Sequence, residues 1–202
     1  MKRLKISVLI SGRGSNLQAL IDASAQPNFP AEIVLVLANV PNAFGLERAR
    51  KAGIATVAIP HRDFAKREDF DKAMDAKLTE AGVEFICLAG FMRLLSADFV
   101  RKWQGRIVNI HPSLLPAFKG MHVHEQAIAA GVRVSGCTVH YVIPELDAGP
   151  PILQATVPVH PGDSADDLAA RVLEAEHRIY PEALRMIAEG RVHLADGRAV
   201  FS

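Results

Sequence analysis

Short apolar runs rich in β-branched residues alternate along the chain with longer segments of helical periodicity. Five of these runs are nearly continuous in apolar residues, as expected of strands covered on both faces: Lys5–Ile10, Ile33–Ala38, Thr56–Ile59, Phe85–Ala89 and Arg106–Ile110. The segments between them place apolar side chains at helical spacing: Ser15–Ser24, Leu46–Lys51, Asp63–Ala81 and Ser96–Trp103. This alternation predicts an α/β fold with a doubly wound, mostly parallel sheet.

The pattern changes after residue 130. Val132–Ile143 and Ile152–Val159 are strand-like runs, and the short connection between them indicates antiparallel pairing and therefore a mixed sheet. A terminal helix is expected to start at Ser164-x-x-Asp167, which has the spacing of a capping box. Pro181 is expected to break or restart that helix, because proline lacks the backbone N–H that a helix interior needs. With no linker-like run in the 202 residues, residues 1–202 are expected to form a single domain.

The sequence marks both ends of one expected helix in the first half of the chain. Asp63 is expected to cap the helix Asp63–Ala81, and Gly82 is expected to end it.

Composition excludes several classes of protein without selecting one. Half of the residues (50%) are hydrophobic and 22% are charged, which rules out disordered and collagen-like chains. Lys and Arg total 23 against 22 Asp and Glu, so no bulk charge indicates a nucleic-acid or membrane partner. No apolar stretch approaches the roughly 20 residues of a membrane span, and the first one is short for a signal peptide. A cytoplasmic protein is expected.

The segment Ser11-Gly12-Arg13-Gly14-Ser15-Asn16 joins the first expected strand to the first expected helix. Glycines let the backbone turn tightly, and free N–H groups at a helix start favour an anion, most often a phosphate. The dinucleotide fingerprint fails because Leu17 stands where its third glycine would be, and no Walker Gly-Lys-Ser/Thr follows. Phosphate binding and an ordinary capped turn remain equal alternatives.

Asn109 and His111 alternate at the end of an expected strand, so their side chains should share one face of the sheet. The carboxyl ends of strands are where doubly wound sheets bind ligands. An amide beside an imidazole indicates an oxyanion donor next to a general acid–base. On these two residues alone, however, an exposed histidine in a proline-rich loop is the favoured alternative.

Two further groups of polar residues have open interpretations. Asp147 lies in the Pro144–Pro150 connection, where an aspartate usually serves the turn itself; alternatively its carboxylate orients His111 and favours the charged imidazole. His122-x-His124 suggests a metal site, but residues two apart face away from each other on a helix and no further ligands accompany them. No metal site is expected.

Taken together, four segments occur in an order and spacing that resembles the glycinamide ribonucleotide formyltransferases, a folate-dependent family of purine biosynthesis. They are Ser11-Gly12-Arg13-Gly14-Ser15-Asn16-Leu17, Ala89-Gly90-Phe91-Met92-Arg93, Asn109-Ile110-His111-Pro112-Ser113-Leu114-Leu115-Pro116 and Glu145-Leu146-Asp147-Ala148-Gly149. The resemblance covers nearly the whole chain. It implies a Rossmann-like formyltransferase fold and transfer of a formyl group from 10-formyltetrahydrofolate, the co-substrate, to the amine of glycinamide ribonucleotide.

The resemblance also implies roles for individual residues. Asn109 would stabilise the oxyanion, His111 would move the proton, and Asp147 would tune His111 and hold a water. The ribonucleotide would be bound by Gly14, Ser15, Asn16 and Glu176. The folate would be bound by Arg67, Met92, Arg93, Leu94, Leu95, Ile143, Pro144, Glu145, Leu146 and Asp147. Pro144 departs from the acidic residue common in the family. No metal is implied, the partners are small-molecule substrates, and a monomer or a homodimer is expected.

Related and unrelated functions compete with this hypothesis. Formyltetrahydrofolate hydrolases usually carry an extra N-terminal domain, and methionyl-tRNA formyltransferases carry a C-terminal RNA-binding domain; neither is expected here. The unrelated alternative is a non-catalytic nucleotide-binding module that uses only the Gly12–Asn16 loop. In such a module, replacing His111 with alanine would leave function intact.

Overall fold

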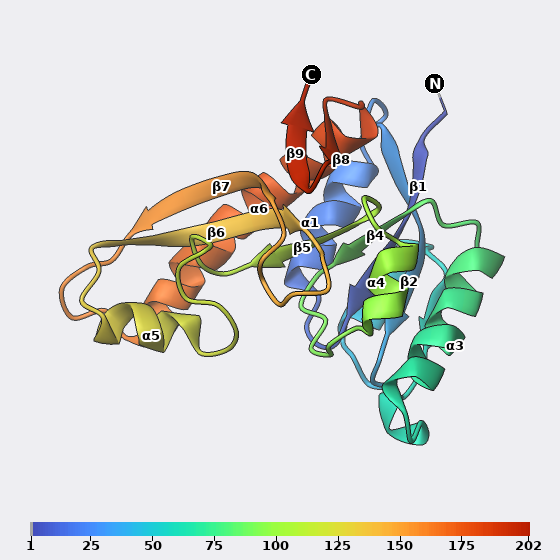
Figure 1. Cartoon of the computed structure of the whole chain (residues 1–202), viewed down its shortest axis with the longest axis horizontal. Helices are drawn as coiled ribbons and strands as arrows, with labels where there is room; N and C mark the ends of the chain where they lie inside the picture. Colours follow the sequence, from blue (N-terminus) through green and yellow to red (C-terminus); the bar gives the residue numbers. More distant parts are fainter. Residues whose placement is uncertain (1) are drawn as a thin grey trace.

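The computed structural model describes residues 2–202 and is built around a seven-stranded sheet (Figure 1). Its strand order is β3-β2-β1-β4-β5-β6-β7. The strands are β1 (Leu4–Ile10), β2 (Ala31–Ala38), β3 (Thr56–Ala58), β4 (Phe85–Leu88), β5 (Ile107–His111), β6 (Val134–Tyr141) and β7 (Pro151–Pro158). The first five are parallel, whereas β6 and β7 pair antiparallel. The predicted α/β fold with a mixed sheet is confirmed.

Helices cover both faces of this sheet (Figure 1). They are α1 (Ser15–Ser24), α2 (Gly45–Lys51), α3 (Arg67–Glu80), α4 (Ala97–Lys102), α5 (Val123–Ala129) and α6 (Ala165–Ala188). Within residues 2–202, no helix has the length and apolar character needed to cross a membrane.

Each face of the sheet has its own hydrophobic core. One core combines side chains of α1, α2 and α6 with the sheet, and the other combines those of α3 and α4. Strand β1 supplies both: Ile6 and Val8 enter the first core and Leu9 enters the second. This two-sided burial explains why the central strands are continuous apolar runs and not alternating ones.

The third helix begins later than the sequence predicts. A single 3₁₀ turn covers His61–Asp63, and α3 starts at Arg67 after the extended residue Lys66, so Asp63 does not cap the helix. Glu68 and Asp69 in the first turn explain the later start, because carboxylates there interact favourably with the positive end of the helix dipole.

Pro181 lies inside α6, which continues to Ala188; the predicted break is wrong. Buried side chains flank the proline on both sides, among them Tyr180 and Leu184. Helix stability in proteins comes mostly from packing of the apolar face, which here outweighs the missing N–H.

Two elements were not predicted from the sequence. Helix α5 follows the Asn109–Pro116 segment, and a two-stranded hairpin of β8 (Val192–Ala195) and β9 (Arg198–Phe201) follows α6. Both are short, and α5 buries only Val123 and Ala127, so neither has a clear apolar period.

Candidate functional site

The strand order reverses direction between β1 and β4, which makes this pair the topological switch point of the sheet. The segments that leave β1, β4 and β5 at their carboxyl ends therefore lie side by side. The first contains the glycine-rich loop, the second contains the Phe91–Leu95 segment, and the third follows His111, the last residue of β5.

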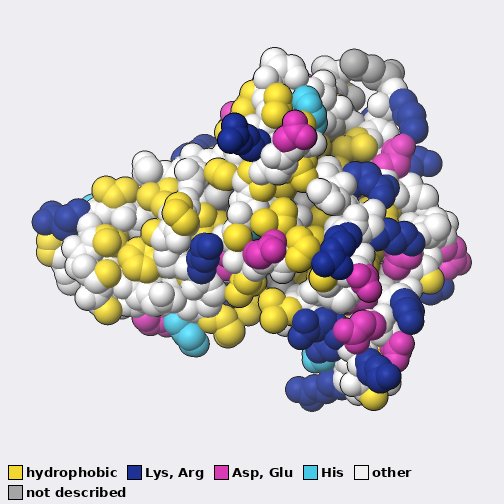
Figure 2. All heavy atoms as spheres, in the orientation of Figure 1, with side chains coloured by type: hydrophobic (Ala, Val, Ile, Leu, Met, Phe, Trp, Pro, Cys, Tyr) yellow, Lys and Arg dark blue, Asp and Glu magenta, His cyan; other side chains and the backbone are white. Residues whose placement is uncertain are grey.

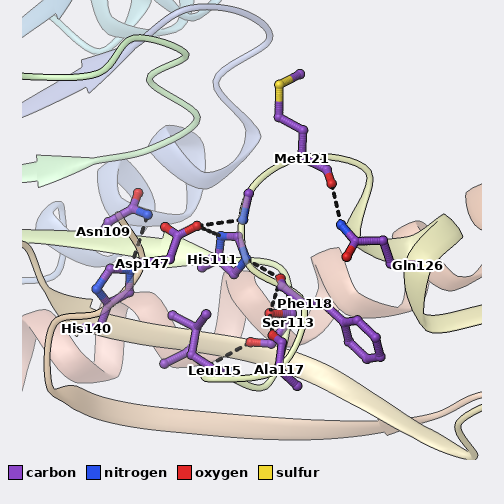
Figure 3. A network of polar contacts seen from close by, with 12 residues as sticks. Asn109, His111, Ser113, Leu115, Ala117, Phe118, Met121, Gln126, His140 and Asp147 are labelled. Atoms are coloured by element: carbon purple, nitrogen blue, oxygen red, sulfur yellow. Dashed lines mark hydrogen bonds and ion pairs between the residues drawn. The ribbon is translucent and has the colours of Figure 1, made fainter. Parts of the chain in front are cut away.

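His111 ends β5 with its side chain 6% exposed. Its Nδ1 lies 3.6 Å from Asp147 Oδ2, and its Nε2 lies 2.9 Å from the carbonyl oxygen of Phe118 (Figure 3). Because the Phe118 carbonyl is an acceptor, Nε2 must carry a hydrogen, and Nδ1 faces the Asp147 carboxylate.

Asp147 reaches His111 from the connection between β6 and β7. Its backbone has φ 49°, in the left-handed region that aspartate tolerates better than most residues. The carboxylate is 9% exposed, and its Oδ2 also accepts the Gly120 N–H at 2.8 Å. This second contact ties the carboxylate to the loop that follows Phe118, so its direction toward the imidazole is fixed from two sides.

Asn109 lies directly opposite His140 in the β5–β6 pair. His140 Nδ1 lies 2.9 Å from the carbonyl oxygen of Tyr141 and must donate to it, and burial lowers the pKa of His140. The ring is therefore neutral, and its Nε2 accepts from Asn109 Nδ2 at 3.4 Å (Figure 3). This fixes which end of the amide is nitrogen and leaves its second N–H free.

The glycine-rich loop is shaped by contact with α2. Gly14 has φ 71°, and a Cβ there would lie 2.7 Å from the Cα of Gly45. The Gly45 N–H also donates to the Gly12 carbonyl at 3.0 Å. Helix α1 starts at Ser15, and its first turn presents N–H groups with no partner inside the helix, the arrangement that binds anions.

Glu176 lies in the middle of α6, with only 6% of its surface exposed. Burial raises the pKa of its carboxyl to about 7, although a hydrogen bond from Asn16 Nδ2 to Oε2, 3.1 Å long, favours the charged form. The Oδ1 atom of Asn16 is buried without a hydrogen-bond partner among the described residues. Glu176 and Asn16 thus form one polar pair beside the start of α1.

Arg93 lies among exposed apolar side chains. Its guanidinium stacks 5.2 Å from the ring centre of Phe70, and its buried Nε has no hydrogen-bond partner among the described residues. Met92 and Leu94 beside it are exposed, as is Leu146 on the opposite loop. Figure 2 shows hydrophobic side chains gathered on the middle of one face, whereas charged side chains concentrate over α3.

The remaining predicted folate-binding residues are less tightly placed. Leu95 is half-buried and packs against the α3 core, and Ile143 is half-buried in the opposite loop. Pro144 and Glu145 are exposed. Arg67, in the first turn of α3, is exposed, and its side chain makes no hydrogen bond or ion pair with the described residues 2–202.

Within the described residues, no group of three or more His, Cys, Asp and Glu side chains is placed to hold a metal ion. His122 precedes the first residue of α5, and its Nδ1 lies 3.7 Å from Glu125 Oε1 on the exposed surface.

Comparison with known proteins shows to which family this chain belongs. The model of the family described as formyl transferase matches residues 4–184. The chain belongs to the formyl transferase family. The phosphoribosylglycinamide formyltransferase of Escherichia coli is 47% identical over 196 residues, which cover 97% of this chain and 92% of that protein. The resemblance inferred from the four sequence segments is thereby confirmed.

The structural neighbours agree with the relatives in sequence. Glycinamide ribonucleotide transformylase 1 from Symbiobacterium toebii superposes with a TM-score of 0.95 and 46% identity, over 98% of this chain and 94% of that one. The trifunctional purine biosynthetic protein adenosine-3 of Gallus gallus is 53% identical over 96% of this chain. The matched region spans only 19% of that longer protein.

Proposed function

We propose that this protein transfers the formyl group of 10-formyltetrahydrofolate to the amine of glycinamide ribonucleotide. The products are formylglycinamide ribonucleotide and tetrahydrofolate. The observation that carries the proposal is the 3.6 Å approach of Asp147 to His111 beside Asn109, three polar groups that come from two separate segments of a formyl transferase chain.

The reaction needs no protein nucleophile. The neutral amine attacks the formyl carbon, a C–N bond forms, and the carbonyl electron pair moves onto oxygen. Asn109 donates its free N–H to that oxygen and so stabilises its negative charge. The nitrogen that attacked loses a proton, N10 of the folate gains one, and the C–N10 bond breaks to release tetrahydrofolate.

His111 and Asp147 carry the proton between these two nitrogens. Because His111 Nε2 is held by the Phe118 carbonyl, the mobile proton resides at Nδ1, on the side of Asp147. The 3.6 Å gap between Nδ1 and Oδ2 is long for a direct hydrogen bond, so a water that contacts both groups completes the relay.

The two substrates lie on opposite sides of the switch point. Gly14, Ser15 and Asn16 hold the ribonucleotide phosphate at the start of α1, and Glu176 accepts hydrogen bonds from the ribose hydroxyls. On the other side the pterin lies between the Met92–Leu95 segment and the Ile143–Asp147 loop. The exposed apolar side chains of Met92, Leu94 and Leu146 fit an aromatic ligand.

A large share of the expected rate acceleration comes from positioning the two substrates. General acid–base catalysis supplies about 10²–10⁴ in rate, and one oxyanion donor supplies about 10²–10³. Holding two reactants in an attack geometry contributes about 7–11 kcal/mol of the barrier. No metal is required, because the amine is already a nucleophile. A cytoplasmic protein of one domain over residues 1–202, present as a monomer or homodimer, is part of the same proposal.

The test is turnover with both purified substrates, followed by the absorbance change of the folate product. Formation of formylglycinamide ribonucleotide is expected. Release of formate with water as the only acceptor would identify a hydrolase and refute the proposal. Unchanged function in His111→Ala would instead favour a non-catalytic nucleotide-binding module.

A further inference from the structure

A chain of hydrogen bonds crosses the carboxyl edge of three adjacent strands, β2, β1 and β4. Asn39 directly follows β2, Ser11 directly follows β1, and Met92 lies four residues beyond the end of β4. The Ser11 hydroxyl lies 2.6 Å from Asn39 Oδ1 and 2.7 Å from the backbone nitrogen of Met92. Ser11 therefore spans the point where the strand order reverses.

The direction of each of these hydrogen bonds is fixed. The Met92 N–H can only donate, so the Ser11 oxygen accepts it. The hydroxyl hydrogen must then point to Asn39 Oδ1, which is an acceptor. A second link runs beside it, from the Ser11 N–H to the Gly90 carbonyl at 3.1 Å.

Asn39 is the buried end of this series of hydrogen bonds. Asn39 is only 2% exposed, and His61 Nδ1 lies 3.2 Å from its Nδ2 and 3.0 Å from its backbone carbonyl oxygen. The tautomer of His61 decides which of these two contacts is a hydrogen bond. The backbone carbonyl of Asn39 also accepts the backbone N–H of His61 at 3.1 Å. A buried amide held in this way keeps the acceptor for Ser11 in one place, so the serine hydroxyl has a single favourable orientation.

The two ends of the link lead to different substrates. Ser11 is the first residue of the glycine-rich loop that reaches Gly14, Ser15 and Asn16, whereas Met92 opens the segment proposed to contact folate. If either segment moves relative to the other, one of the hydrogen bonds of the Ser11 hydroxyl is stretched. Both hydrogen bonds have good geometry only when the two segments are in one relative position.

We propose that the Ser11 hydroxyl, oriented by Asn39, is a positioning group that couples the binding of the ribonucleotide to the binding of the folate. It touches neither reacting atom. It sets the distance between the two substrate-binding segments across the switch point, so that occupation of one segment favours the binding-competent position of the other. The inference rests on the proposed function.

The experiment is a binding cycle with two ligands that cannot react together, glycinamide ribonucleotide and tetrahydrofolate. The Kd of each is measured by calorimetry, alone and with the other at saturation, for the native protein and for Ser11→Ala. The native protein is expected to show tighter binding of each ligand in the presence of the other. In Ser11→Ala this coupling factor should fall about two- to tenfold, the value of one hydrogen bond.

Three variants separate coupling from loss of structure. Ser24→Ala removes a hydroxyl that bonds only to the Leu20 carbonyl within α1, and should leave the coupling unchanged. Ser11→Thr keeps a hydroxyl at the link and should restore it. Asn39→Leu keeps Ser11 but removes its acceptor, and should reduce the coupling as Ser11→Ala does. It also serves as the second test if Ser11→Ala does not fold.

The outcomes distinguish this inference from the proposed function. If the native protein binds neither ligand and shows no turnover, the proposed function fails. If it turns over normally but binds the two ligands independently, or if Ser11→Ala and Asn39→Leu keep the full coupling factor, the role of Ser11 is refuted and the proposed function stands.

Discussion

Glu176→Gln is the substitution with the most sharply defined consequence for stability. Glutamine keeps the shape of the side chain and an oxygen that can accept the Asn16 N–H, but it cannot ionise. The native carboxyl has a pKa of about 7 because burial penalises its charged form, against 4.5 when it is exposed in the unfolded chain.

The sign of the effect follows from where the proton is bound. Between pH 4.5 and 7 the folded protein keeps a proton on Glu176 that the unfolded chain has released. The native protein therefore loses stability as pH rises through this window and does not regain it above pH 7. Each pKa unit corresponds to about 1.36 kcal/mol, so the loss amounts to about 3 kcal/mol.

Urea unfolding at a series of pH values from about 4 to about 8 measures this quantity. The free energy of unfolding of Glu176→Gln minus that of the native protein should rise by about 3 kcal/mol between the two ends, because all other groups titrate in both proteins. Glu174→Gln, an exposed position on the same helix, is the matched control and should give a flat difference. A flat difference for Glu176→Gln as well would refute the assignment of the raised pKa to burial.

The same titration should be visible in substrate binding. An ionised carboxylate accepts hydrogen bonds from ribose hydroxyls more strongly than a protonated one, so the native KM for the ribonucleotide should fall as pH rises through about 7. Glu176→Gln should lose this pH dependence. The KM for the folate should follow the same pH profile in both proteins.

Three other predictions concern the residues around the reaction. His111→Ala should lower kcat about 10²–10⁴-fold and Asn109→Ala about 10²–10³-fold, with KM for both substrates little changed; near-normal kcat in either would show that its assigned role is wrong. Ser15→Ala should raise KM for the ribonucleotide and spare that for the folate, and an equal rise in both would contradict phosphate binding at this residue. Gly14→Ala should destabilise the fold by more than about 1 kcal/mol in urea unfolding, because φ is positive there and the new Cβ would meet Gly45 Cα at 2.7 Å. Unchanged stability of that variant would show that the loop shifts freely.

The sheet was predictable because its signal is local. Runs such as Phe85–Ala89 are apolar without interruption, and only strands covered on both faces need that composition. Helix boundaries and breaks were less predictable. The start of α3 at Arg67 depends on competition between neighbouring acidic residues, Asp63 against Glu68 and Asp69. The continuity of α6 through Pro181 depends on packing against the rest of the fold, which a short stretch of sequence does not reveal.

The site, too, was predictable from the sequence only in part. The alternation of Asn109 and His111 on one strand could be read directly from the sequence, but their partners could not. His140 faces Asn109 only because of the register of β5 against β6, and Asn16 meets Glu176 across 160 residues of chain. Contacts of this kind depend on the three-dimensional arrangement of strands and helices, which spacing along the chain does not specify.

The parallel strands and the antiparallel hairpin of the sheet contribute different residues to the site. The parallel strands β1 and β4 end in the two segments that would hold the substrates, and Ser11 joins these segments across the switch point. The antiparallel hairpin β6–β7 supplies His140 opposite Asn109 and carries Asp147 to His111. Substitutions in the segments that follow β1 and β4 should therefore change KM, whereas substitution of His140, which orients Asn109, should change kcat. Ser15 and His140 allow this difference to be measured, because Ser15 lies at the start of α1, where the phosphate would bind, and His140 contacts the amide that would stabilise the oxyanion.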